Sequence, residues 1–474
     1  MKTDVLLIQP QQGEFVKKRI FHPGLEIPLN IACLAAYLDV QGIDNRILDM
    51  RLYDAPFKDL EDTIKMYSPR IVGISAFTSE YDNAIKSAKI IKSINKDILI
   101  VIGGHHAAAM PSELLEEIPE FDLLIHGEGE LALTEIIRQF DSGRDYTEIS
   151  GVSYRNGDSV VVVPRAELIA SLDDLPFPAR HKLDLSRYVP SPGTGNYMQL
   201  PTTGIMASRG CPYKCNYCSK GVWGATIRFR SVENVLAEVE HCIEKYGIHD
   251  YRFYDDALTL PQWELKRFCE EIIKRKLNIT WNCYSRVNGI TEDKLLAMKE
   301  AGCYHIKYGI EFGTEKALKI ANKGATLNQA RNAVALTKKV GIECKGNFML
   351  GIPGETEADL EQTIKYAIEL SPDLATFYPF DLFPGNTFYR RKLEGDNSID
   401  DRLPREITQK MSNKGYISFY FRAGFIIQRL KRMAKNPMRE IRLVKNGLAM
   451  IIQYFFRKWF QKDSGQAGTH TSSS

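Results

Sequence analysis

Residues 208–218 read SRGCPYKCNYC and place Cys211, Cys215 and Cys218 in a C-x3-C-x2-C spacing on one loop. Three thiolates from one tight loop can bind three irons of a [4Fe–4S] cubane, whereas clusters used only for electron transfer usually take four cysteines. A zinc site needs four ligands, usually grouped as two pairs, and no second pair is evident. Core cysteines, the other alternative, would not gather on a loop punctuated by Gly, Pro and Asn. The motif therefore predicts an iron–sulfur cluster whose fourth iron is open to a small molecule.

Strand-like and helix-like patterns alternate on both sides of this loop. Residues 1–140 alternate five Val/Ile/Leu-rich strand candidates with helices, which predicts a doubly wound, Rossmann-like parallel sheet covered on both faces. From Gly204 onward, six strand candidates alternate with amphipathic helical stretches, which predicts a (β/α)6 partial TIM barrel with its chemistry at the carboxyl ends of the strands. The fold class is therefore α/β. The barrel strands are expected over 204–208, 250–254, 280–284, 305–310, 344–349 and 374–379.

The chain has 474 residues, which is too long for one ordinary core, so several domains are expected. A hydrophobic content of 44% and a charged content of 26% are ordinary for a soluble globular protein. Residues 146–203 hold a candidate hairpin around Asn156-Gly157 and a Pro-rich stretch, which reads as a connector. The expected division is a Rossmann-like domain over 1–145, the connector over 146–203, the partial barrel over 204–390, a basic helical C-terminal region over 391–463 and a disordered tail over 464–474.

The cysteine motif and the strand ends that follow it resemble the radical SAM superfamily, over Thr203 to about Tyr389. Residues 309–313 (GIEFG) are similar to its G-I-E-S-G segment, with Phe312 where serine is usual, and residues 351–356 (GIPGET) match its G-x-P-G-E-T loop. The resemblance implies reductive cleavage of S-adenosylmethionine (SAM) at the cluster to give a 5′-deoxyadenosyl radical. It assigns the cluster, as metal ligands and catalytic residues, to Cys211, Cys215 and Cys218, and implies SAM contacts from Tyr217, Asp255, Arg286, Glu311, Gly351 and Pro353.

Two glycine-rich loops follow strands of the N-terminal domain, and glycine lets backbone approach a large ligand closely. They are residues 103–106 (GGHH) and residues 126–130 (HGEGE). Placed ahead of the barrel, they resemble the cobalamin-binding subgroup of radical SAM enzymes. The D-x-H-x-x-G pattern that supplies an axial histidine in other cobalamin proteins is absent, and a degenerate domain that binds nothing is the alternative. The resemblance implies cobalamin contacts from Gln9, Pro10, Ser75, Gly103, Gly104, His105, Gly127 and Glu128.

The charges behind the net charge of +3 are unevenly distributed along the chain. From Lys410 to Lys462 there are thirteen Lys/Arg and one acid, a sum of +12, so the rest of the chain sums to −9. This region mixes basic residues with aromatic and aliphatic runs, and its longest apolar stretch is about half of what spans a bilayer. Such helices suit an anionic membrane surface, so we expect peripheral membrane contact. A solvated helical cap is the alternative, and we expect no nucleic-acid partner.

The cysteine count and the amino terminus both favour the cytoplasm. Nine cysteines do not form a disulfide framework, and an oxygen-sensitive cluster needs a reducing compartment. The chain opens with MKTDVLLIQP, without a charged-then-apolar leader. The six cysteines outside the motif are expected to be small buried core residues: Cys33, Cys242, Cys269, Cys283, Cys303 and Cys344.

These features lead to the hypothesis of a cobalamin-dependent radical SAM methyltransferase acting on an unactivated centre of a hydrophobic or lipid-like small molecule. A reductase, flavodoxin or ferredoxin would supply electrons. A radical oxidative cyclase or carbon–carbon bond-forming enzyme with the same cofactors is one alternative, and an iron–sulfur binding or electron-transfer module is another. A methylthiotransferase is disfavoured because its N-terminal domain needs three further cluster cysteines, and only Cys33 precedes Cys211.

Overall fold

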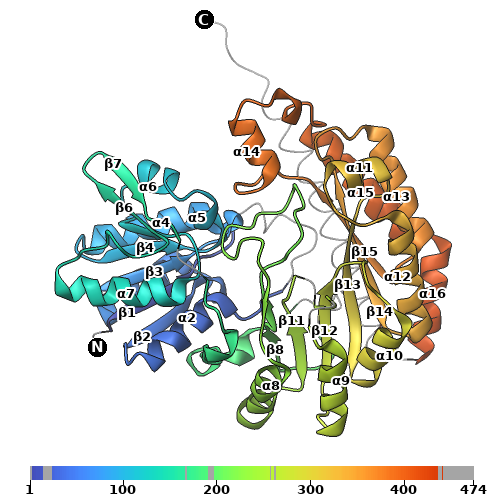
Figure 1. The fold of residues 1–474 in the computed structure, drawn as a ribbon, viewed down its shortest axis with the longest axis horizontal. Helices are drawn as coiled ribbons and strands as arrows, with labels where there is room; N and C mark the ends of the chain where they lie inside the picture. The colour runs from blue at the N-terminus through green and yellow to red at the C-terminus, as the bar shows by residue number, and fades with distance from the viewer. Residues whose placement is uncertain are drawn as a thin grey trace, which may run out of the picture.

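The computed structural model describes residues 3–13, 24–165, 168–190, 197–256, 258–260, 263–435 and 440. Figure 1 shows an N-terminal sheet domain (blue to cyan) beside a curved, barrel-like sheet (green to orange), with the C-terminal helices on the barrel side. The α/β fold class predicted from the strand and helix patterns is confirmed.

The N-terminal sheet has the strand order β2-β1-β3-β4-β5-β6-β7, and its first five strands are parallel. Alternate residues of β1 face opposite layers: Val5 and Leu7 pack with α2 and α7, whereas Leu6 and Ile8 pack with α3 and α4. Burial on both faces is why these strands are continuously apolar. The elements are β1 Val5–Gln9, α2 Leu29–Val40, β2 Asn45–Asp49, α3 Pro56–Tyr67, β3 Ile71–Ser75, α4 Tyr81–Ile94, β4 Leu99–Gly103, α5 His105–Ala109, α6 Glu113–Glu117, β5 Leu123–Ile125 and α7 Gly129–Ser142.

The hairpin expected around Asn156-Gly157 forms, and it extends the N-terminal sheet. Strands β6 (Val152–Asn156) and β7 (Ser159–Val162) are antiparallel, and β6 pairs antiparallel with β5. The turn uses Gly157 at φ +61°, a backbone conformation that glycine adopts without strain. The N-terminal sheet therefore continues beyond residue 145 into the segment expected to be a connector.

The second sheet consists of six parallel strands in the order β15-β14-β13-β12-β11-β8, an open partial barrel. Its first strand is β8, Thr202–Ile205, and not residues 204–208 as expected. The chain leaves the sheet early because Ser208–Arg209 (β9) pairs antiparallel with Arg228–Phe229 (β10), below the cysteine loop. The other elements are α8 Val232–Tyr246, β11 Asp250–Phe253, α9 Leu265–Lys274, β12 Thr280–Ser285, α10 Glu292–Glu300, β13 Cys303–Glu311, α11 Glu315–Ile320, α12 Leu327–Val340, β14 Glu343–Leu350, α13 Glu357–Leu370 and β15 Leu374–Pro379.

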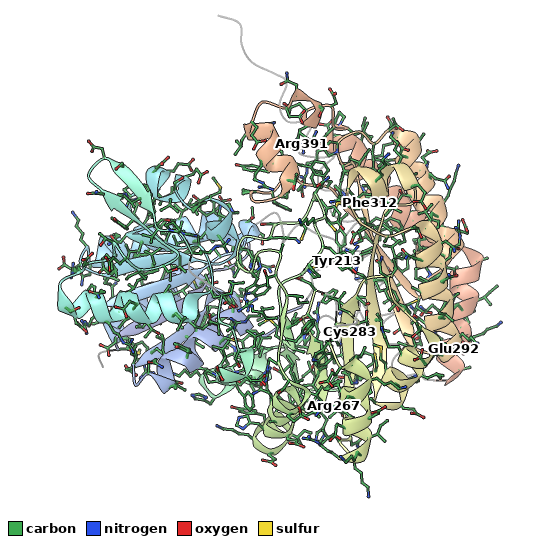
Figure 2. The ribbon with its side chains drawn as sticks, in the orientation of Figure 1. Tyr213, Arg267, Cys283, Glu292, Phe312 and Arg391 are labelled. Carbon is green, nitrogen blue, oxygen red and sulfur yellow. The ribbon has the colours of Figure 1, made fainter. Side chains whose placement is uncertain are left out.

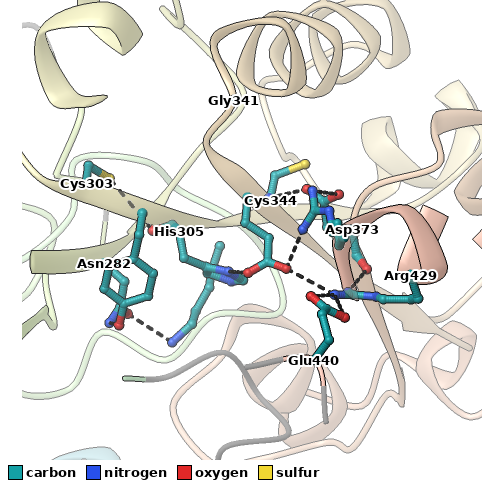
Figure 3. A network of polar contacts seen from close by, with 12 residues as sticks. Asn282, Cys303, His305, Gly341, Cys344, Asp373, Arg429 and Glu440 are labelled. Atoms are coloured by element: carbon teal, nitrogen blue, oxygen red, sulfur yellow. Dashed lines mark hydrogen bonds and ion pairs between the residues drawn. The ribbon is translucent and has the colours of Figure 1, made fainter. Parts of the chain in front are cut away.

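Three C-terminal helices follow: α14 (Thr387–Leu393), α15 (Arg405–Tyr420) and α16 (Ala423–Lys435). Helix α16 docks at the amino ends of β14 and β15, where Arg429 contacts Glu343, Glu440 and the Asp373 carbonyl (Figure 3). Part of the basic charge that suggested a membrane surface is therefore used in ion pairs within the protein. Residues 441–474, including the predicted disordered tail, lie outside the described residues. Among the helices the structure describes, none is long and apolar enough to cross a membrane.

Candidate active site between the two domains

The cysteine loop begins with a turn that requires glycine, and it is anchored at the end of α11. Gly210 has φ +93°, and a Cβ there would lie 2.0 Å from the Thr226 carbonyl oxygen, so only glycine fits. Asn216 donates from its backbone N–H to the Ala321 carbonyl (2.9 Å) and from its side chain to the Ile320 carbonyl (2.7 Å). Tyr213 of this loop and Phe312 lie toward the carboxyl ends of the barrel strands, whereas Cys283 lies in the wall below (Figure 2).

The three motif cysteines fit an iron–sulfur cluster better than a single metal ion. Cys215 is buried and Cys218 is exposed. Cys215 and Cys211 both lie close enough to Cys218 for their charges to act on it, so the three thiols are neighbours. Within the described residues, no three His, Cys, Asp or Glu side chains converge where one metal ion fits. Zinc needs all its ligands within about 2.3 Å of one point, whereas a cubane takes each cysteine on a different iron.

Two of the predicted SAM contacts, Tyr217 and Glu311, come together through a lysine that sequence reasoning did not assign. Lys323 Nζ lies 3.2 Å from Glu311 Oε1 and 3.0 Å from the Tyr217 hydroxyl. Glu311 ends β13 at φ +71°, in the left-handed region, and β13 shifts register against β14 between Gly309 and Glu311. This irregularity brings the carboxylate back over the strand, since a Cβ on Gly309 would lie 2.6 Å from Glu311 Oε1. The result is a carboxylate, an ammonium and a phenol in one row beside the cysteine loop.

Arg286 links this row to the cluster position. Its Nη1 lies 3.5 Å from Cys215 Sγ, its Nη2 donates to the Lys323 carbonyl, and its guanidinium carbon stands 3.6 Å from the centre of the Tyr213 ring. A guanidinium beside a thiolate ligand stabilises the negative charge of a bound cluster. The structure therefore places Arg286 against Cys215, one of the three cysteines predicted to bind the cluster.

Asp255, also predicted to contact SAM, has its carboxylate occupied by the protein. It accepts from the Ser208 hydroxyl and from the Ala207 N–H (3.2 Å), and its burial raises its pKa to about 6. It thus ties the start of the cysteine loop to β11. The neighbouring Asp256 is the second acid of the pair that follows β11. It lies close enough to Cys211 and Cys218 for its charge to act on both thiols, so it lies beside the predicted cluster position.

The Gly351–Thr356 loop is held mainly by its own acid. Glu355 Oε2 accepts from the N–H groups of Gly351 (2.8 Å) and Ile352 (2.9 Å), and burial raises the pKa of Glu355 to about 7. A Cβ on Gly351 would lie 2.4 Å from Thr408 Cγ2 on α15. Gly351 therefore lets α15 pack against the end of β14, and Pro353 lies buried in the same loop.

A cleft of about 440 Å³ separates the glycine-rich strand ends from the barrel. Seven of the eight predicted cobalamin contacts line it, and Pro10 does not. The barrel contributes Met206, Arg209, Val222, Trp223, Arg252 and Tyr254. The seven N-terminal residues are Gln9, Ser75, Gly103, Gly104, His105, Gly127 and Glu128.

The cleft floor fits a large, mostly apolar ligand. Gly104 has φ +92°, and a Cβ there would lie 2.9 Å from the backbone of Ala76, so bare backbone forms this edge. Cys33, expected in a core, is half-buried and lines the cleft, while the other five cysteines outside the motif are buried. Burial raises the pKa of Cys33 to about 11, so it presents a neutral thiol. The floor of the cleft would therefore offer a planar macrocycle a surface of backbone, small side chains and aliphatic side chains.

Below the cleft, a buried polar network fixes the ends of β1 and β3. Gln9 donates to Glu80 (2.7 Å), and Asn30 donates to Gln9 (3.0 Å) and to the Ser75 hydroxyl (2.8 Å). Burial raises the pKa of Glu80 to about 7. Asn30 and Glu80 were missed because they lie on helical segments far from Gln9 in sequence.

His105 lies between the N-terminal side of the cleft and Trp223, which follows the cysteine loop. Its ring stacks on Phe77 at 4.9 Å between centroids and meets the edge of Trp223 at 5.6 Å. Burial lowers its pKa, so the imidazole is neutral at pH 7. Trp223, five residues after Cys218, gave no signal in the sequence because its partner is more than one hundred residues away.

Glu128 is the centre of an ion-pair cluster between the domains, here called the Glu128 clamp (Glu128, Glu130, Arg209 and Arg228). Glu128 accepts from Arg209 (2.8 Å), Arg228 (2.9 Å) and the Ile169 N–H (3.0 Å), and Glu130 accepts from Arg209 (2.6 Å). The two arginines are cross-strand partners in β9 and β10, an unfavourable pairing of like charges that the carboxylates offset. Arg209 lies two residues before Cys211. The predicted cobalamin loop is therefore bonded to the base of the cysteine loop.

Comparisons with known proteins agree with this arrangement. The sequence model of the radical SAM superfamily matches residues 205–367, and that of the B12 binding domain matches residues 23–137. The structure of the methyltransferase TsrM from Kitasatospora setae, solved with tryptophan and a SAM analogue, superposes with a TM-score of 0.67 over 81% of this chain and 75% of that one, at 22% identity. At this identity the likeness shows a shared fold.

Two curated relatives cover most of the chain. An uncharacterized methyltransferase of Pyrococcus horikoshii is 33% identical over 90% of this chain and 94% of its own length. An anaerobic magnesium-protoporphyrin IX monomethyl ester cyclase of Rubrivivax gelatinosus is 30% identical over 79% of this chain and 69% of its own length. With the cysteine loop and the glycine-rich cleft, these matches show that the chain belongs to the cobalamin-binding radical SAM enzymes.

Proposed function

We propose that this enzyme is a cobalamin-dependent radical SAM methyltransferase that acts on an unactivated centre of a hydrophobic small molecule. The observation that carries the proposal is the continuity of the cleft: one wall is the glycine-rich edge of the N-terminal sheet, and the other reaches the cysteine loop through Trp223 and Arg209. When bound, the cluster supplies the electron that cleaves SAM, and cobalamin carries the methyl group. The 33% identical methyltransferase supports this reaction class.

The residues of this chain have separable parts in that reaction. Lys323 orients the Glu311 carboxylate and the Tyr217 hydroxyl, which we assign to the polar groups of SAM. Arg286 holds Cys215 and stabilises cluster charge. Asp255 holds the start of the cysteine loop against β11, and Gly351 lets α15 pack against the end of β14.

The exposed residues and the residues that line the cleft support three partners: an electron donor, a hydrophobic substrate and a membrane surface. Cys218 is the exposed member of the three cysteines, so an electron donor such as a flavodoxin, a ferredoxin or a reductase would approach from its side. The cleft lining includes Leu34, Phe77, Leu133 and Trp223, which suit a hydrophobic substrate. Exposed Phe421, between α15 and α16, and exposed Leu430 on α16 support a peripheral membrane contact.

Anaerobic reconstitution tests the proposal. The purified protein should retain cobalamin, as its visible spectrum reports, and should convert SAM to both 5′-deoxyadenosine and S-adenosylhomocysteine. Glu311→Gln should lower SAM affinity, whereas Cys283→Ala, a buried cysteine outside the motif, should keep both products. A protein that binds no cobalamin, or that makes 5′-deoxyadenosine without any S-adenosylhomocysteine, would contradict methyl transfer.

A radical cyclase is the second candidate, because the magnesium-protoporphyrin cyclase is 30% identical over 79% of this chain. The two reactions differ in product mass: methylation adds about 14 daltons, whereas oxidative cyclisation removes hydrogens. Mass spectrometry of a converted substrate therefore separates them.

A further inference from the structure

The interior of the partial barrel carries an excess of buried cations. Lys307 on β13 and Lys345 on β14 are directly opposed in register and are only 3% and 7% exposed. Their neighbours Ile306, Tyr308 and Cys344 pack outward among the helices, so by strand alternation both lysines face inward. Like charges directly opposed across strands are destabilising, and a buried ammonium is costly unless it is paired.

Arg252 of β11 completes this group. Its guanidinium carbon is 5.0 Å from the centre of the Tyr284 ring, and Lys307 Nζ is 5.1 Å from the same centre. The charge of Arg252 also lowers the pKa of Lys345, which falls to about 8 mainly through burial. Arg252 and Glu26 line the cleft, so the group is continuous with the site described above.

The carboxyl groups that face these cations do not balance them. Glu26 pairs with Arg252 and also faces the charge of Lys307, and Asp250 accepts from the Thr280 hydroxyl, so two carboxyl groups face three basic side chains. Lys307 donates to Asn282 Oδ1 at 3.2 Å. Among the residues that the structure describes, no carboxylate lies within ion-pair distance of Lys345. This group of described residues thus holds more basic than acidic side chains within low-dielectric walls, an arrangement that favours binding of an anion.

We propose that the substrate carries an anionic group, a carboxylate or a phosphoryl group, that binds inside the barrel between Lys345, Lys307 and Arg252. The reacting centre of the substrate then points up toward the cysteine loop and the cleft. This inference rests on the proposed function, because it places the substrate of that same site. It makes the substrate an amphiphile, with its hydrophobic part along the cleft and its charge below.

The test uses full-length, anaerobically reconstituted protein and two probes, inorganic phosphate and acetate, against sodium chloride at equal ionic strength. At least one probe should raise the unfolding temperature of the wild type. Lys345→Met should weaken binding of that probe at least tenfold, and Lys345→Arg should retain most of it. The control Lys96→Met removes an exposed lysine of the N-terminal domain and should bind like the wild type. The stronger probe identifies the class of anion.

If Lys345 had only a structural role, Lys345→Met would be less stable than the wild type in chloride buffer alone. We expect it to be at least as stable, because it removes an ammonium opposed to Lys307. Lys345→Gln repeats this comparison with a polar replacement. Equal probe binding by wild type and Lys345→Met, or no response to either probe, would overturn the inference. Probe binding needs no SAM cleavage, so enzyme that transfers methyl groups without binding either anion contradicts only this inference, and the reverse result contradicts only the proposed function.

Discussion

Removing the carboxylate of Glu128 tests whether the two domains are held in register by the Glu128 clamp. The side chains of Glu128, Arg209 and Arg228 are 6%, 9% and 11% exposed, so their charges are poorly screened by solvent. Removing one partner of a buried ion pair typically costs about 3–5 kcal/mol, because the other charge stays buried and uncompensated. Glu130 still holds Arg209 in Glu128→Ala, so we expect the lower end, about 3 kcal/mol.

The assay has two readouts. The free energy of unfolding from urea titration at pH 7 reports stability, with Glu116→Ala as the control, since Glu116 is an exposed acid of the same domain. The ratio of S-adenosylhomocysteine to 5′-deoxyadenosine reports alignment: loosening the clamp should reduce methyl transfer more than SAM cleavage, because the cluster loop itself remains on the barrel. A double-mutant cycle with Arg228→Ala should give a coupling energy of about 0.5–3 kcal/mol.

Acid should have the same effect as the mutation. The arginines hold the pKa of Glu128 below its usual value of 4.5, so its contribution to stability is fully present above that value and is lost as the pH falls through the lowered pKa. The reasoning is refuted if Glu128→Ala and Glu116→Ala agree within about 0.5 kcal/mol, the usual range for surface substitutions, and the product ratio does not move.

Three further outcomes are expected. Cys211→Ala should lose most of the reconstituted iron and all SAM cleavage, while Cys283→Ala retains both; iron analysis and chromatography of 5′-deoxyadenosine decide it. The raised pKa of Glu80 means that folding favours its protonated form, so the contribution of Glu80 to stability falls as the pH rises from about 4.5 to about 7. Glu80→Gln should remove that fall and be roughly 1–3 kcal/mol more stable than the wild type at pH 8 in urea titrations. A wild-type stability that stays constant from about pH 4.5 to about pH 7 would contradict this prediction. Gly351→Ala should cost clearly more stability than Gly395→Ala, because both have positive φ but only Gly351 would place a Cβ against Thr408; equal urea midpoints would show that α15 shifts freely.

Periodicity and turn residues predict the fold well in this chain, because each parallel strand is buried on both faces and leaves an apolar run in the sequence. The six barrel strands and the five parallel strands of the N-terminal sheet were located from those runs. The start of β8 was misplaced because residues 206–208 are as apolar as a strand, and only the pairing of β9 with β10 takes them out of the sheet.

Site residues that act through long-range pairing could not be found in this way. Arg228 meets Glu128 across one hundred residues, and Arg429 meets Glu343 across 86. A lone basic residue in sequence looks solvated, and its burial depends on the tertiary fold. The same holds for Lys345, which reads as an ordinary strand lysine until the register opposes it to Lys307.

At position 311 the residue that is best for stability differs from the residue that activity requires. A residue other than glycine in the left-handed conformation costs about 1–2 kcal/mol, which glycine would recover. A library selected only for heat resistance should therefore enrich glycine or asparagine at position 311, whereas a library selected for turnover should retain glutamate. Consensus or thermostability engineering of this enzyme would do well to leave that residue unchanged.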